Sequence, residues 1–299
     1  MRLTQIRDFL AVVDAGSIRA AARSLGLTQP ALTKSLRKLE QELGASLVTR
    51  SVRGVAATAN GRAFLARARA VSSGLRLARE EIAQLNGARE GSLAIGSAPG
   101  PGLGLLPEAL VRFRERWPQV AVRLVDVSPA EVLPALREGA LDLALSVRMG
   151  PLADLPGDCR AVALYPNAAA IIARRGHALA GARRLAALVG AEWIRTAAPH
   201  NTSALPDMFR AAGLPEPRYR VDCGSFLLVP ALVARSDLLA VVPWQIAERE
   251  SRADPIVALR MREAIPERQI SLFRRVDVPP TPAAGEFAQI LQECARRLR

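Results

Sequence analysis

Apolar residues in the first 45 positions recur every three or four residues, the spacing that places them on one face of a helix. This pattern predicts helices over residues 3–15, 17–24 and 28–43. A glycine follows the first and third helices, as is common at helix C-termini. A serine or threonine precedes the second and third, where its side chain can cap free backbone N–H groups.

The third predicted helix has an apolar face and a polar face. Its leucines form a buried stripe, and its polar residues point outward. The outward residues are Gln29, Thr33, Lys34 and Arg37. Two short helices joined by a tight turn, with a polar outer face on the second, are the layout of a helix-turn-helix, whose second helix enters the DNA major groove. Residues 47–58 then predict two short strands that turn near Arg53-Gly54, a basic wing suited to contacting phosphates.

A long amphipathic helix is predicted over residues 58–86. Its apolar or small positions alternate steps of four and three, which is the a/d repeat of a coiled coil. These positions are Phe64, Ala68, Val71, Leu75, Ala78, Ile82 and Leu85. The pattern predicts that two chains pair through this helix. The alternative is that the stripe packs against the rest of its own chain. Glycines at 87 and 91 indicate a hinge after the helix.

From residue 92 short apolar runs alternate with helical patterns, which is typical of βαβ units and a parallel sheet. The first set comprises strands 92–97, 120–126 and 141–147 with helices 103–117 and 129–138. The second comprises strands 168–174, 192–196, 218–223 and 237–242 with helices near 183–189, 203–212 and 225–235. A strand at 269–274 and a helix at 283–298 follow. Two such sets predict two lobes, with a ligand cleft between them beyond the carboxyl ends of the strands.

The charge of the chain is positive and uneven. Its 299 residues carry a formal net charge of +13, with 15 Lys and Arg against 7 Asp and Glu in residues 1–91 and 26 against 21 in the remainder. Nucleic acid is therefore an expected partner, although a general arginine bias would also raise the charge. We find no signal peptide pattern, no membrane-spanning run and no metal-binding cysteine spacing, so a cytoplasmic location is expected.

Several motifs resemble the N-terminal domain of LysR-type transcriptional regulators. They are Leu3-x-Gln5-Ile6-Arg7-x-Phe9, Gly16-Ser17, Ala21-Ala22, Thr28-Gln29-Pro30-Ala31-Leu32, Leu39-Glu40, Leu43-Gly44 and Thr58-x-x-Gly61. The resemblance is specific over residues 1–65 and architectural beyond about residue 92. Thr33, Val48 and Ala57 depart from the commonest family residues but preserve their character.

The resemblance implies a multidomain α and α/β protein. Residues 1–58 would form a winged helix-turn-helix, 59–91 a dimerising linker helix and hinge, and 92–299 a two-lobed α/β effector domain similar to a periplasmic binding protein. Lobe 1 would comprise about 92–161 and 267–299, and lobe 2 about 162–266. The resemblance also implies a homotetramer on a double-stranded DNA operator, RNA polymerase as a further partner, and a small-molecule co-inducer with no fixed cofactor.

The family's functional positions can be carried over residue by residue. The DNA-facing set is Gln29, Pro30, Thr33, Lys34, Arg37, Arg50 and Arg53. Glutamine can pair with adenine and arginine or lysine with guanine, while the wing arginines suit phosphates or the minor groove. The effector set is Ser97, Ala98, Pro99, Ser128, Ser146, Thr196, Asn201, Thr202, Ser225 and Phe226. The alternative is that these hydroxyls only cap helices and satisfy strand ends.

The Pro-Gly-Pro-Gly run at 99–102 departs from the family pattern, because its prolines donate no backbone hydrogen bonds. We therefore expect a less polar ligand wall, suited to an aromatic body with one acidic group that Arg148 or Arg195 could neutralise. The stretches Cys223-Gly-Ser225-Phe226 and 236–239 are similar to members that govern the catabolism of aromatic or sulfonated aromatic compounds.

Enzyme classes are poorly supported. The glycine-rich loop at 96–104 would fit an NAD-dependent oxidoreductase only superficially, because Leu105 stands where a dinucleotide-binding turn requires glycine. His177 and His200 belong to no nucleophile motif, so a hydrolase is not indicated. A solute-binding protein would fit residues 92–299 but not the N-terminal segment. We expect a regulator with no enzyme activity and no metal site.

Overall fold

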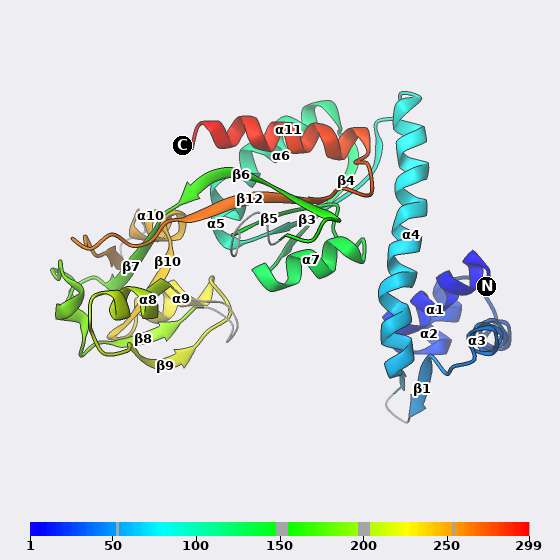
Figure 1. Cartoon of the computed structure of the whole chain (residues 1–299), viewed down its shortest axis with the longest axis horizontal. Coiled ribbons are helices and arrows are strands. Elements are labelled where there is room, and N and C mark those ends of the chain that lie inside the picture. The colour runs from blue at the N-terminus through cyan, green and yellow to red at the C-terminus, as the bar shows by residue number, and fades with distance from the viewer. Residues whose placement is uncertain (52–53, 148–154, 197–203, 253–254, 299) are drawn as a thin grey trace.

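The N-terminal segment of the computed structural model, which describes residues 1–51, 54–147, 155–196, 204–252 and 255–298, folds as a winged helix-turn-helix (Figure 1). Its elements are α1 (Leu3–Ala15), α2 (Ile18–Ser24), α3 (Gln29–Leu43), β1 (Val48–Ser51) and β2 (Gly54–Ala57). The expected caps are present, since the side chains of Ser17 and Thr28 accept hydrogen bonds from the backbone of α2 and α3. This part of the predicted fold is confirmed.

The leucine stripe of α3 forms the centre of this domain. Leu32, Leu36 and Leu39 are each at most 1% exposed and pack with Phe9 of α1 in one apolar cluster. Each buried side chain of this size contributes roughly 1.5–3 kcal/mol. Phe9 also meets Phe64 edge to face, with ring centroids 5.2 Å apart. The following long helix therefore begins inside the core of the winged domain.

That long helix is α4 (Ala59–Leu85), 27 residues in one piece. The Thr58 hydroxyl accepts a hydrogen bond from Gly61 N at 2.9 Å and donates one to Ser46 O at 2.6 Å, so it caps α4 and ties it to the preceding loop. A side chain at Gly61 would overlap the carbonyl oxygen of Leu47, which explains the glycine. Within the described ranges, α4 and the other helices are too short or too polar to cross a membrane.

The first α/β unit, which we call lobe 1, is built on a mixed sheet in the order β4–β3–β5–β12–β6. Its strands are β3 (Glu90–Ser97), β4 (Gln119–Asp126), β5 (Leu143–Val147), β6 (Cys159–Asn167) and β12 (Arg268–Arg275). Its helices are α5 (Pro99–Gly104), α6 (Leu106–Arg116), α7 (Pro129–Arg137) and α11 (Pro282–Arg296). The helices α6 and α11 pack on one face of the sheet, and α7 packs on the other.

The second unit, lobe 2, has a mixed sheet in the order β11–β7–β10–β8–β9. Its strands are β7 (Ala169–Arg174), β8 (Glu192–Arg195), β9 (Arg218–Asp222), β10 (Leu238–Pro243) and β11 (Ile256–Ala258). Its helical elements are η2 (Leu185–Leu188), α8 (Ala204–Ala211), α9 (Leu228–Val233) and α10 (Trp244–Arg252). Apolar clusters cover both faces of this sheet, one around Trp193 and the other around Val229.

The expectation of parallel sheets is wrong for part of each sheet. The strand β12 returns from lobe 2 to pair antiparallel with β5 and β6, and β7 pairs antiparallel with β10 and β11. The strands β6 and β11 and the helix α10 are absent from our prediction. The apolar run in β6, residues 161–165, is short and is followed by Pro166, a residue that strands disfavour. Because β6 belongs to lobe 1, the chain first crosses between lobes at Ala168, later than the expected position near 161–162.

The expected single helix over 103–117 is also wrong, because two helices occupy this region. The chain bends at Leu105, between α5 and α6. Pro107 lacks a backbone N–H and disfavours helical geometry in the residue before it, so a break just upstream of it is expected physically.

A polar cluster fastens α4 to lobe 1. The Asp142 carboxylate, 6% exposed, accepts hydrogen bonds from Arg76 Nη2 at 2.8 Å and from Ala94 N at 2.7 Å. Arg76 Nη1 also lies 2.9 Å from both Glu80 and Ser92. One arginine of α4 therefore compensates a buried carboxylate and also holds Glu80 of α4 and Ser92 of β3.

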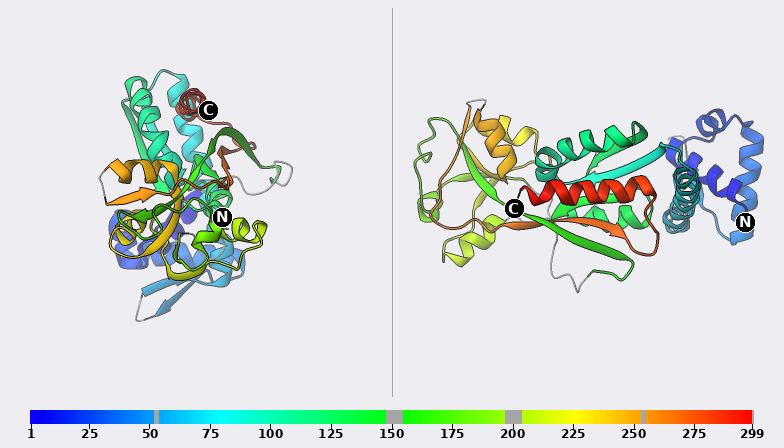
Figure 2. Two further views of the ribbon diagram at one scale, coloured as in Figure 1. Left: turned by 90° about the vertical axis from the view of Figure 1, so that its left-hand side faces the viewer. Right: turned by 90° about the horizontal axis from the view of Figure 1, so that it is seen from above.

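The C-terminal half of α4 adds a second attachment to lobe 1. The Gln84 side-chain amide donates to Glu90 O at 3.0 Å and accepts from Ala283 N at 3.0 Å, so it joins β3 to the start of α11. Figure 2 shows the resulting order in space: lobe 2, lobe 1, α4 and the winged domain follow one another along the longest axis. Among the described residues, the winged domain is therefore connected to lobe 2 through α4 and lobe 1.

A substitution at Gly139, in the turn after α7, can test how closely α4 lies against lobe 1. Its φ is +68°, and a Cβ there would overlap Ser73 of α4. Gly213 has a φ of +67° with no atom within 4 Å of such a Cβ. Alanine at either site adds left-handed strain of about 1–2 kcal/mol. Only Gly139→Ala adds the overlap, so we expect it to lose a further ~1–3 kcal/mol of unfolding free energy in urea titrations. Equal losses for the two variants would contradict the contact.

Candidate functional site

The outer face of α3 gathers the predicted DNA-facing residues of that helix. Gln29, Pro30, Lys34 and Arg37 are exposed and Thr33 is half-buried. At 3.6 residues per turn the five span an arc of about 140°, opposite the buried leucines. The ion pairs formed within the described ranges leave Lys34 and Arg37 without a carboxylate partner. Their positive charges therefore remain available to an external anion.

Two carboxylates hold α3 in place from behind. Asp8 of α1 is 4% exposed and accepts a hydrogen bond of 2.6 Å from the Ser35 hydroxyl, which ties α1 to α3. Glu40, near the end of α3, accepts hydrogen bonds from Leu47 N at 2.8 Å and Val48 N at 3.2 Å. The Glu40 carboxylate fixes the start of the wing relative to α3, so the distance between α3 and the wing stays constant.

The wing is attached to the corner between α1 and α2. Val55 N donates to Gly16 O at 2.8 Å, and a Cβ at Gly54 would lie 2.6 Å from the same oxygen. Gly54 also has a φ of +120°, so a glycine is required here on two grounds. Arg50 is exposed on β1, as predicted for a phosphate contact, and Arg53 lies outside the described residues.

Five predicted effector residues lie together at the carboxyl ends of three lobe 1 strands. They are Ser97, Ala98, Pro99, Ser128 and Ser146. The backbone joins them: Val127 N donates to Ser97 O at 3.1 Å, and Ala98 N donates to Leu145 O at 2.7 Å. This is the position at which open α/β sheets bind ligands.

Two of these serines already have local hydrogen bonds. The Ser128 hydroxyl and backbone N–H both donate to Glu131 at the start of α7, at 2.7 and 2.8 Å, and these bonds hold the pKa of Glu131 below its usual value. The Ser97 hydroxyl donates to Ala98 O at 2.8 Å. The hydroxyls of Ser97 and Ser128 therefore cap a helix or satisfy a strand end, as in the alternative to effector binding that the sequence left open.

Ser146 is different, because its hydroxyl is fully buried and has no hydrogen-bond partner among the described residues. Ser271 of β12 lies directly opposite it across the strand pair and is equally buried and equally without a partner in that set. Buried hydroxyls without partners are uncommon because they cost free energy, so this pair is a candidate for a functional role. Sequence reasoning selected Ser146 and missed Ser271, whose signal is a single serine within an apolar strand.

The lobe 2 residues follow the carboxyl ends of β8 and β9. The Thr196 hydroxyl donates to Val241 O at 3.1 Å, Ser225 is exposed, and Phe226 packs against an apolar cluster. Arg195 pairs with Asp222 at 2.9 Å and lies over the Tyr219 ring, so its charge is already balanced. Three expected ligand contacts, Arg148, Asn201 and Thr202, lie outside the described residues.

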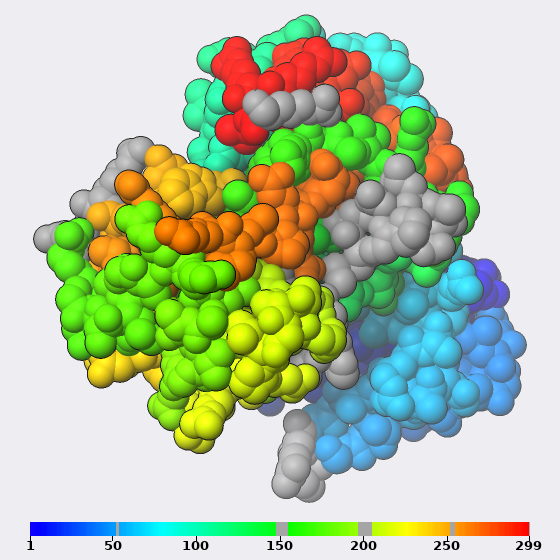
Figure 3. Space-filling model, turned by 60° about the vertical axis from the view of Figure 1, so that its left-hand side comes forward, coloured from blue at the N-terminus to red at the C-terminus, as the bar shows by residue number. Residues whose placement is uncertain are grey.

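The glycine-rich segment brings the two groups of strand ends together. A Cβ at Gly100 would lie 3.1 Å from the Asn167 amide and 3.4 Å from Pro243, and one at Gly104 would lie 3.1 Å from Gln245. The glycines at i and i+4 leave one side of α5 flat, so the β10–α10 corner of lobe 2 packs closely against it. Figure 3 shows the two lobes in contact. Asn167 and Gln245, which line this contact, are absent from the sequence-based set.

A winged helix-turn-helix joined through a long helix to a two-lobed α/β domain defines a ligand-responsive transcriptional regulator. Two family models match the chain: the bacterial regulatory helix-turn-helix protein of the lysR family over residues 3–62, and the LysR substrate binding domain over residues 86–296. The chain belongs to the LysR family of transcriptional regulators and is not an enzyme, so the oxidoreductase alternative is excluded.

Individual relatives extend over the whole chain. The SDS degradation transcriptional activation protein of Pseudomonas sp. (strain ATCC 19151) is 31% identical over 98% of this chain and 97% of its own. The regulator GalR of Pseudomonas putida is 30% identical over 94% of this chain and 70% of its own. Among solved structures, the LysR family regulator CbnR matches with a TM-score of 0.74 and 24% identity over 99% of both chains.

The buried hydroxyls give a stability test of the effector region. Ser146→Ala removes a buried hydroxyl without a partner among the described residues, so we expect unfolding free energy to stay level or rise by about 1 kcal/mol. Thr196→Ala removes a hydroxyl bonded to Val241 O, so we expect a loss of about 1 kcal/mol. Thermal and urea unfolding of both variants measure the difference. A clear loss in Ser146→Ala would mean that its hydroxyl has a structural partner.

Proposed function

We propose that α3 reads an operator in the major groove with Gln29, Pro30, Thr33, Lys34 and Arg37, while Arg50 and Arg53 contact the flanking phosphates or minor groove. One observation carries the proposal: the α3 face combines amide, hydroxyl and uncompensated cationic side chains on one exposed arc. Such side chains make bidentate contacts to adenine and guanine edges. The similar regulator CbnR has been crystallised at full length in complex with its target DNA, which supports this use of the fold.

We further propose that two chains pair through α4, and that dimers associate into a tetramer. Phe64 and Ala68 pack within the winged domain's own core. By contrast Val71, Leu75, Ile82 and Leu85 are between 38% and 71% exposed. A continuous exposed apolar stripe at heptad spacing favours a partner helix, since water is a poor neighbour for it.

The ligand in this proposal is a small organic anion with an apolar body, held between the lobes by the strand ends that carry Ser97, Ser146 and Thr196. Arg148, Asn201 and Thr202, the further ligand contacts expected from the sequence, belong to the same proposal. Support comes from the hydroxyl-rich strand ends and from the name of the SDS degradation activator, since SDS is an alkyl sulfate. A thermal-shift screen of aromatic acids, aryl sulfonates and short alkyl sulfates tests the class; no stabilisation by any of them would refute it.

Effector binding regulates transcription in this scheme by changing how the lobes and α4 are arranged. A ligand shifts such an equilibrium only when it binds the alternative arrangements with different affinities, and operator DNA must then change ligand affinity by the same factor. Figure 1 shows that, in the described part of the chain, lobe 1 lies between lobe 2 and α4 and links them. Binding curves for ligand with and without operator measure this coupling directly.

Operator binding is tested by a matched pair of variants on α3. We expect Arg37→Ala to weaken binding by about 1–3 kcal/mol, roughly a 5- to 150-fold rise in Kd, because Arg37 lies on the reading face. Lys38→Ala removes the same charge about 100° further round the helix and should have a much smaller effect. Anisotropy titrations at several salt concentrations, on an operator selected from random duplexes by this protein, give both values. Equal losses of operator affinity in the two variants would mean that α3 contributes only its positive charge and does not read the sequence with Arg37.

The exposed stripe of α4 gives a second test. Ile82→Glu places a charge within the proposed seam, so we expect the dimer dissociation constant to rise by roughly tenfold or more. Ser72→Glu adds the same charge to an exposed position beside the seam and should change dimerisation little. Sedimentation equilibrium measures both. An unchanged oligomer in Ile82→Glu would show that subunits associate through another surface.

A further inference from the structure

A pocket of about 340 Å³ lies between α4 and lobe 1, away from the contact between the two lobes. Its walls come from three parts of the chain: the middle of α4, the turn between α7 and β5, and the segment from the end of β12 to the start of α11. The volume falls within the range of roughly 300–1,000 Å³ found for small-molecule sites.

The walls of this pocket are apolar. Ala70 and Leu77 contribute from α4, Leu141 from the turn before β5, and Val278 and Pro279 from the segment before α11. Such a lining favours a hydrocarbon body, since burying it removes apolar surface from water on both sides.

The charged groups of the pocket are mainly positive. Three arginines line it, Arg67, Arg274 and Arg275, against a single carboxylate, that of Asp142. Asp142 is already compensated by Arg76, and Arg275 is paired with Asp277. Neither Arg67 nor Arg274 has a carboxylate partner in the part of the chain that the structure describes; Arg274 donates only to Arg275 O at 3.3 Å. The pocket therefore presents two uncompensated guanidinium groups beside an apolar chamber.

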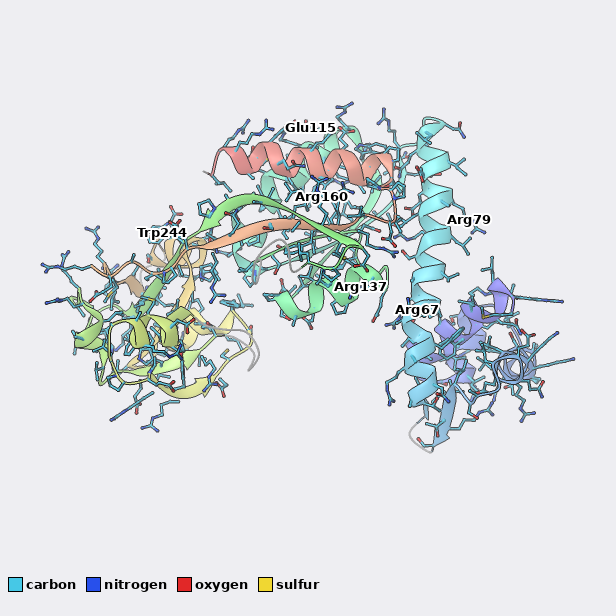
Figure 4. The ribbon with its side chains drawn as sticks, viewed as in Figure 1. Arg67, Arg79, Glu115, Arg137, Arg160 and Trp244 are labelled. Carbon is cyan, nitrogen blue, oxygen red and sulfur yellow. The ribbon has the colours of Figure 1, made fainter. Side chains whose placement is uncertain are left out.

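Figure 4 places the two sides of this junction, with Arg67 on α4 and Arg137 at the end of α7. We propose that the pocket is a second ligand site, separate from the one between the lobes, and that it takes an amphipathic organic anion. The hydrocarbon part occupies the apolar chamber, and the single carboxylate or sulfate head binds Arg274 and Arg67. Charge-assisted hydrogen bonds to guanidinium groups suit both heads.

A ligand there contacts α4 and lobe 1 at once. Its binding favours whichever arrangement of the two keeps the pocket at this size, and any change in operator affinity must equal the reciprocal change in ligand affinity. A ligand in this pocket therefore changes the contact between α4 and lobe 1 that Arg76 and Asp142 form. The two lobes need not move relative to each other.

Octanoate, with ten non-hydrogen atoms, is the probe, and octanol is its uncharged counterpart. Isothermal titration of the full-length protein measures binding without reference to DNA. We expect Arg274→Ala to weaken octanoate binding about ten- to hundredfold and octanol binding much less, because only the carboxylate uses the guanidinium.

Gly74→Leu supplies a variant that fills the pocket without disturbing the fold. Gly74 lines the pocket within α4, a Cβ there meets no atom within 4 Å, and leucine has the higher helix propensity. We expect Gly74→Leu to abolish octanoate binding, and Ser72→Leu, on another side of the same helix, to preserve it.

Two results would overturn the proposal. The first is no octanoate binding by the native chain at millimolar concentration, and the second is equal affinity in the native chain, Arg274→Ala and Gly74→Leu, which would place octanoate elsewhere. Operator titrations without octanoate report separately on DNA binding, so failure of the second site is distinguishable from failure of the proposed regulator function.

Discussion

Asp142 is a carboxylate that folding removes almost entirely from water, and its compensation comes from two separate segments. One hydrogen bond is donated by Ala94 N within lobe 1, and the other by Arg76 from the linker helix. A buried carboxylate left without its cation is strongly destabilising, so α4 must dock against lobe 1 in the orientation that delivers Arg76. This joint helps to set the position of the winged domain relative to lobe 1. Gln84 adds a second attachment nearer the C-terminal end of α4.

Close approach is the second constraint, and glycines provide it at both joints of the molecule. Gly139 lets the turn after α7 reach Ser73 on α4, and Gly100 and Gly104 let lobe 2 lie against α5. The sequence makes the latter segment look like a nucleotide-binding turn. Its chemistry is the opposite, because prolines remove the donors that a pyrophosphate needs and the flat side of the helix is covered by protein. Small residues here serve contact between domains.

Local patterns were sufficient to predict the winged domain, where the caps Ser17 and Thr28 and the α3 leucines specify each helix within a few residues. They were insufficient where pairing is decided at long range. The strand β6 has only a short apolar run, followed by Pro166, and its hydrogen-bonding partner β12 lies a hundred residues later. For the same reason Ser146 could be selected as a polar residue at a strand end, whereas Ser271 acquires meaning only from lying opposite it.

The length of α4 converts small angular changes into displacements on the scale of DNA. One part of the helix is held by lobe 1 and its beginning is built into the winged domain through Phe64. The part of the helix between the Arg76 joint and its first residue, Ala59, makes an arm of about 25 Å, so a tilt of about 8° moves the far end by about 3.5 Å, close to the 3.4 Å rise of one base pair. A small rotation at the joint can thus move each winged domain by one base pair along the duplex.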